Sequence, residues 1–166
     1  MKFDMQYSVL VLCVCALPAL ADVNIVGNVA AKCIIQTDTG GVYGNPTATK
    51  LSTLPADGGV VPIVRYDVAV ANYYTAKITH PSAFSSSPTL TDTVAWTGVS
   101  SVAQTTVAGM AAYDAAKVVY GSTTNFNLTI AGSTWFKTAS TATYGVGKAF
   151  PGGSYTAVVQ AECIAN

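Results

Sequence analysis

Residue types that commonly carry catalysis or hold metal ions are sparse in this chain. His80 is its one histidine, and no spacing in the sequence supplies the partners that a catalytic or metal-bound histidine needs. Because Pro81 follows it, we interpret His80 as a turn residue. Asp57-Gly58-Gly59 matches a metal loop only in its first acid and is more typical of a hairpin turn. No G-x-S-x-G elbow, phosphate loop or C-x-x-C pair occurs. We therefore expect a protein without enzymatic activity, metal or cofactor.

The N-terminus has the pattern of a secretory signal. Lys2 precedes an apolar run from Val9 to Leu20, and Ala19-Leu20-Ala21 then provides small residues at the first and third places. A charged start, a short apolar core and an A-x-A site are typical of export. The apolar run is too short to span a bilayer comfortably. We predict cleavage after Ala21.

The cysteines fall into two pairs. Cys13 and Cys15 lie in the apolar run and would leave with the signal; the bulky residue before Cys13 argues against lipidation. Cys33 and Cys163 remain in the mature chain. An even number of cysteines in an exported protein predicts a disulfide, with two buried free thiols as the alternative.

Charge is low and balanced along the chain. The chain has eight Lys and Arg residues and eight Asp and Glu residues, and no basic patch stands out. Nucleic acid is therefore not an expected partner. Balanced charge also removes the repulsion that keeps molecules apart, which suits a subunit that packs against copies of itself.

Short runs rich in β-branched and aromatic residues predict an all-β sandwich rather than a βαβ fold. Ala103–Ala116 is rich in alanine but contains Gly109, and we expect a loop or strand there with a short helical turn. The predicted strands are Val60–Ala71, Tyr73–Thr79, Val94–Val102, Lys117–Tyr120, Phe126–Ile130, Thr134–Phe136 and Tyr155–Ile164.

The last predicted strand has one apolar face made of mostly small residues. That face carries Tyr155, Ala157, Val159, Ala161 and Cys163. Because side chains alternate along a strand, all five would point inward together. Small inward residues leave room for side chains of another strand. An ordinary strand in a tightly packed sandwich fits the same alternation.

The start of the mature chain alternates in the same way. Val23, Ile25, Gly27 and Val29 lie on one face of a predicted strand that begins at the free terminus. Such a strand is able to reach its own sheet or the edge of a neighbour's sheet, and strand addition in trans is a known mode of assembly.

These two ends resemble those of chaperone–usher pilins, especially the type 1 group. Pilins of this kind begin with an alternating strand that contains a glycine and is soon followed by a cysteine, here Gly27 and Cys33. They also carry a glycine fourteen residues from the end, the place of Gly153. The chain departs from the pattern at Ala165, where the family has a tyrosine, and in having its second cysteine at Cys163.

The resemblance implies an incomplete immunoglobulin-like sandwich that is completed by a donor strand from a neighbouring subunit. Residues 1–21 would be the signal peptide, 22–32 the donor extension and 33–166 the pilin domain. Val23, Ile25 and Val29 would enter a groove, with Gly27 where no side chain fits. Tyr155, Ala157 and Val159 would line that groove.

The resemblance also implies partners and a location. A periplasmic chaperone would lend the missing strand first, and an outer-membrane usher would pass subunits into a pilus, or fimbria, on the cell surface. The fibre would support adhesion or biofilm formation. Whether the chain is a major or a minor subunit stays open, as does any receptor.

A carbohydrate-binding β-sandwich is the main alternative. Trp96, Trp135 and the pair Tyr73-Tyr74 are aromatic residues of the kind that line sugar sites, although aromatic residues on strands more often belong to a core. A two-domain tip adhesin does not fit a chain of this length, and a secreted enzyme or enzyme inhibitor is a third, more remote reading.

Overall fold

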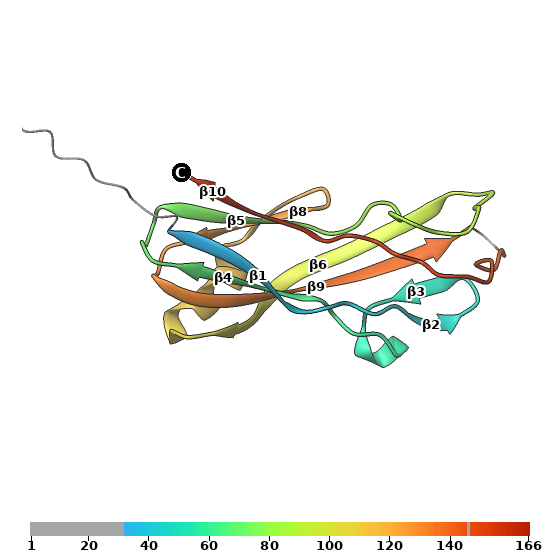
Figure 1. The fold of residues 1–166 in the computed structure, drawn as a ribbon, viewed down its shortest axis with the longest axis horizontal. Coiled ribbons are helices and arrows are strands. Elements are labelled where there is room, and N and C mark those ends of the chain that lie inside the picture. Colours follow the sequence, from blue (N-terminus) through green and yellow to red (C-terminus); the bar gives the residue numbers. More distant parts are fainter. Residues whose placement is uncertain (1–31, 146) are drawn as a thin grey trace, which may run out of the picture. The chain divides into compact units, whose positions relative to one another are not determined.

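A computed structural model describes residues 32–145 and 147–166, which we call the unit. Strands dominate, arranged in two antiparallel sheets with little helix (Figure 1). The predicted all-β fold is confirmed. The predicted leader, its cleavage site and the donor residues Val23, Ile25, Gly27 and Val29 lie outside the described residues.

The larger sheet is built around one long strand. One edge of β9 pairs with β4 and, further along, with β3, while its other edge pairs with β6. The outer strands are β1, which pairs with β4, and β2, which pairs with β3. The six strands are β1 (Cys33–Thr39), β2 (Gly44–Thr47), β3 (Lys50–Ser52), β4 (Ile63–Val68), β6 (Val94–Thr105) and β9 (Gly132–Tyr144).

The smaller sheet has the order β10-β5-β8-β7, so β10 and β7 are its edges. Its strands are β5 (Tyr74–Thr79), β7 (Val118–Tyr120), β8 (Thr123–Leu128) and β10 (Gln160–Ala165). Three short helical turns complete the unit: η1 (Pro55–Asp57), η2 (Ala108–Ala112) and α1 (Tyr113–Ala116).

Alternating side chains from both sheets build the core. Along β4 and β8, every second residue is buried, as a strand with one face toward a partner sheet requires. Tyr66 meets Phe136 edge-on with ring centroids 5.5 Å apart, and Phe126 lies 4.3 Å from Phe136. Burying each such side chain contributes roughly 1.5–3 kcal/mol relative to exposure.

Three sequence predictions change in detail. The segment Ala103–Ala116 continues β6 through Thr105 and then forms η2 and α1, so the expected short helical turn is present. The last strand joins its ladder only at Gln160, after an extended stretch. The predicted hairpin turn at Asp57-Gly58-Gly59 is wrong, because η1 ends there with Gly58 in the left-handed region, at a φ of 78°.

Candidate functional site

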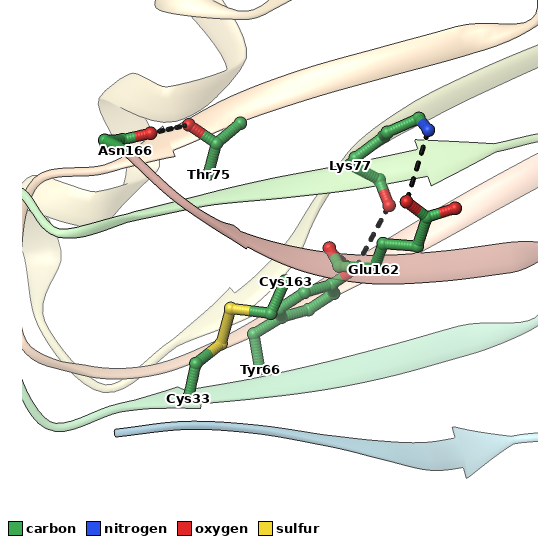
Figure 2. The surroundings of a disulfide bond; sticks show 7 residues. All are labelled: Cys33, Tyr66, Thr75, Lys77, Glu162, Cys163 and Asn166. Carbon is green, nitrogen blue, oxygen red and sulfur yellow. Dashed lines mark hydrogen bonds and ion pairs between the residues drawn. A yellow bond between two sulfur atoms is a disulfide. The ribbon is translucent and has the colours of Figure 1, made fainter. Parts of the chain in front are cut away.

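The most distinctive feature of the unit is the seam where the edges of its two sheets meet. β1 is an edge of the larger sheet and β10 an edge of the smaller one. A disulfide between Cys33 and Cys163 ties them together, with the two Cα atoms 6.5 Å apart (Figure 2). The predicted disulfide is confirmed.

A buried tyrosine holds the seam beside this bridge. Tyr66 projects from β4, and its hydroxyl donates to the carbonyl oxygens of Glu162 and Lys77, at 3.1 and 3.3 Å (Figure 2). The side chain is fully buried, and this burial raises the pKa of the Tyr66 hydroxyl far above its usual value. One strand of the larger sheet is thus fixed to two strands of the smaller.

Polar contacts on the outer face of the smaller sheet secure β10 further. The Lys77 ammonium lies 3.2 Å from a Glu162 carboxylate oxygen, and Thr75 Oγ1 donates to Asn166 Oδ1 at 2.7 Å (Figure 2). Both pairs link β5 to the C-terminal end of the chain. The ion pair is largely exposed, so its own contribution to stability is small.

Beyond the bridge the seam opens into a groove. The extended segment that leads into β10, residues 155–159, forms one wall, and the chain at the end of β1, residues 37–43, forms the other. Figure 1 shows the chain that leads into β10 running along the length of the unit before the strand begins. Two adjoining hollows of about 610 and 240 Å³ occupy the groove, and Gly41, Tyr43 and Ala157 line both.

The backbone of residues 155–159 has partners on one side only. Thr156 exchanges hydrogen bonds with Ser86, at 2.8 and 3.3 Å, and accepts a third from Ser85. Ala157, Val158 and Val159 belong to no ladder in the described part of the chain. Since the N–H and C=O groups of successive residues in an extended chain point to opposite sides, the neighbours of Thr156 direct theirs toward the groove.

The side chains of this wall alternate as the sequence predicts. Tyr155, Ala157 and Val159 are half-buried and Thr156 and Val158 are exposed, although all five border the hollows. The structure therefore brings the three predicted acceptor residues together along one groove.

An aromatic cluster closes the end of the groove farthest from the bridge. The Tyr155 ring lies 5.0 Å from the ring of Phe84 and 5.2 Å from that of Phe150, and its hydroxyl donates to the Pro151 carbonyl at 2.6 Å. Tyr144 stacks on Phe150 at 5.1 Å. These contacts fix Tyr155 in the wall of the groove.

Sequence reasoning missed the opposite wall and this cluster. Gly40-Gly41 reads only as a turn in the sequence, yet both residues line the groove beside Tyr43. The contacts of Phe84 and Phe150 join segments far apart in the sequence, and periodicity within one strand gives no signal for such contacts.

The aromatic residues that suggested a sugar site do not gather in one place. Trp96 faces inward and packs against Phe84 at 4.7 Å. Trp135 lies on the outer face of β9, with the Arg65 guanidinium 5.0 Å above its ring. The two tryptophans are therefore on opposite faces of the larger sheet. The pair Tyr73-Tyr74 lies at the start of β5.

Residues 32–145 and 147–166 contain no cluster of three or more His, Cys, Asp and Glu side chains placed to hold a metal ion. No helix in the same part of the chain has the length and apolar character to cross a membrane. Comparisons with protein-family models, with curated proteins and with solved structures gave no match.

Proposed function

We propose that this chain is a structural subunit of a bacterial surface pilus that polymerises by donor-strand exchange. In this proposal the unit is an immunoglobulin-like sandwich lacking its last strand, and the N-terminal segment of a neighbouring copy fills the groove. The observation that carries the proposal is the open groove between residues 37–43 and 155–159, with apolar side chains along its wall and backbone groups left free at its edge.

The groove suits an extended strand better than a compact ligand. An unpaired strand edge binds an extended segment through main-chain hydrogen bonds, and pockets for alternate side chains add specificity. Tyr155, Ala157 and Val159 recur at every second residue, which matches the repeat of Val23, Ile25, Gly27 and Val29. Both repeats have the two-residue period of a β-strand.

Chain connectivity favours a donor from another copy. The Lys32 carbonyl accepts a hydrogen bond from the Ala69 amide at 2.8 Å. Lys32 therefore continues the line of β1 on the side of the bridge opposite the groove. To fill its own groove, the segment 22–31 would have to turn back past Cys33–Gln36. At about 3.3 Å per residue, that return would use roughly half of the segment.

A contact between copies that does not close on itself produces an open filament. The proposed route runs through the periplasm, where a chaperone occupies the groove first, and then through an outer-membrane usher to the cell surface. The resulting fibre would serve adhesion or biofilm formation.

Deleting Asp22–Val29 while keeping the leader tests the proposal. We expect a subunit that folds with its chaperone but forms no ladder of multimers in mild detergent without boiling. Three buried apolar side chains at roughly 1.5–3 kcal/mol each, together with a ladder of backbone bonds, would be lost. Electron microscopy of cells making this variant should show no fibres.

Two single substitutions extend the test, one as a matched control and one as a second disruptive change. Asn24→Ala changes a residue on the other face of the donor strand and should leave the ladder intact. Gly27→Leu should weaken the ladder, because its side chain would enter a groove without room for it. Normal fibres from the deletion strain would contradict the proposal.

A further inference from the structure

We propose that the donor strand binds in a single register, in which Ile25 lies opposite Ala157 and Gly27 opposite Tyr155, with the Cys33–Cys163 bridge blocking its path at one end. This inference rests on the proposed function and specifies the recognition code of the same groove.

The bridge blocks the path of a guest strand. A strand inserted between two others lies about 4.8 Å from each, so the flanking strands must be nearly 10 Å apart. The Cα atoms of Cys33 and Cys163 are only 6.5 Å apart. A guest strand must therefore end before the bridge.

The blocked end fixes the direction of the guest. Its C-terminal end continues into the folded unit of its own subunit at Cys33, so only its free N-terminus is able to abut the bridge. The guest then runs from the bridge toward Tyr155, antiparallel to the segment 155–159 and to β10.

The free backbone groups define which residues pair. Thr156 is turned toward Ser86, so Tyr155, Ala157 and Val159 present their N–H and C=O groups to the guest. In an antiparallel ladder, such residues exchange two hydrogen bonds with the residue directly opposite. Three guest residues spaced by two would each make this exchange.

Side-chain sizes select the register among the possible ones. In the proposed register, Ile25 faces Ala157 and Gly27 faces Tyr155, so a large residue meets a small one at each of these two places. Val23 then faces Val159. Val29 falls past Tyr155, in the part of the larger hollow that Gly153 lines. A side chain on Gly153 would meet Pro88 there, since an added Cβ atom would lie 2.6 Å from it.

A shift of two residues toward the bridge is unfavourable. Gly27 would face Ala157 and leave a void between two small residues. Asp22 would then lie opposite Glu162, directly beside Cys163, where the bridge leaves too little width for a guest strand.

The opposite shift is unfavourable as well. It would bring Ile25 onto Tyr155, whose ring is already packed between Phe84 and Phe150. Overpacking such a site forces side chains out of their favoured rotamers. It would also move Gly27 past the end of the wall at Tyr155.

Cysteine trapping tests the register directly. Asn24 and Val158 face each other on the outer side of the proposed pair, and Val158 is 57% exposed, so it tolerates replacement. The chain carrying Asn24→Cys and Val158→Cys is assembled, oxidised mildly and boiled without reductant. We expect a covalent ladder that reductant removes. Directly opposite residues meet disulfide geometry, whereas diagonal ones about 7–8 Å apart do not.

Two matched pairs report the neighbouring registers. Asn24→Cys combined with Gln160→Cys or with Thr156→Cys places the second thiol two residues to either side, again on exposed positions. A ladder from either control pair, or from none of the three pairs while the unmodified chain assembles, overturns the register and leaves the proposed function standing. Absence of multimers from the unmodified chain overturns the proposed function itself.

Compensating substitutions provide an independent measurement. Ala157→Val should reduce multimer yield at least tenfold, and adding Ile25→Ala should restore most of it. Rescue by Val23→Ala or Val29→Ala in place of Ile25→Ala would show that a different residue faces Ala157 and would overturn the register.

Discussion

At the scale of single residues, Tyr66 does more than fill the core. Its hydroxyl donates to backbone carbonyls of both β5 and β10, the strand pair that carries one wall of the groove. A buried hydroxyl with partners is stabilising, whereas removal of the donor leaves buried acceptors unsatisfied. Tyr66 therefore couples the core of the unit to the position of its open edge.

Replacing Tyr66 by phenylalanine should change the response of stability to pH. Burial raises the pKa of the Tyr66 hydroxyl, so the folded chain keeps a proton that the unfolded chain releases above about pH 10. Unfolding then releases a proton, and stability falls as pH rises, by up to about 1.4 kcal/mol per pH unit. Urea unfolding at pH 8 and pH 11 measures this.

Tyr66→Phe should cost about 1 kcal/mol at pH 8 and lose less stability than the natural chain between pH 8 and 11. Equal losses in the two proteins would mean that Tyr66 is not the group responsible.

At the scale of elements, β1 and β10 are edge strands of different sheets joined by one covalent bond. The bond connects residues 130 positions apart, so it constrains almost the whole unit in the unfolded chain. It also holds the closed end of the groove at a fixed width. The same bridge thus serves the stability of the unit and the shape of its open side.

Replacing both cysteines by serine should lower the free energy of unfolding. Loop-closure entropy gives about 4–5 kcal/mol as a model-dependent upper figure. Urea unfolding of the oxidised natural chain and of the Cys33→Ser, Cys163→Ser chain measures the difference, with the reduced natural chain as control. Unchanged stability would mean that the unfolded state is not constrained by the bridge.

Most strands could be predicted from the sequence because their alternation is local. β5 and β7 match their predicted runs within one residue at the start, and the inward face of 155–159 follows from its period of two. The full length of β9 could not be predicted, because its second half is polar and small and is held by pairing with β6 and β3. The groove's second wall was missed because it forms only when β1 and β10 meet.

At the scale of the whole molecule, the proposed assembly makes each subunit's stability depend on a neighbour. A ligand that binds only the folded state stabilises that state, and the unfolding temperature keeps rising with the logarithm of the ligand concentration above the dissociation constant. The free subunit should therefore be much less stable than the same subunit within a fibre.

A peptide corresponding to residues 22–31 should reproduce this effect in the chain that lacks Asp22–Val29. At a hundredfold excess over its dissociation constant, the peptide should add about 2.7 kcal/mol and raise the unfolding temperature by several degrees. Calorimetry measures the shift, and a peptide with leucine in place of Gly27 is the control. Equal shifts from both peptides would indicate nonspecific binding.

The central position of β9 also governs when the chain becomes able to fold. Residues 33–105 contain five of the six strands of the larger sheet, yet β3, β4 and β6 all depend on β9, which begins only at Gly132. Pairing between such distant segments is slow, because the intervening chain must be closed into a loop first. A chain translocated from its N-terminus would therefore remain without its main sheet until nearly all of it had crossed. In the proposed assembly, such late folding would keep the polypeptide extended during export and would delay the appearance of a groove able to bind the wrong strand.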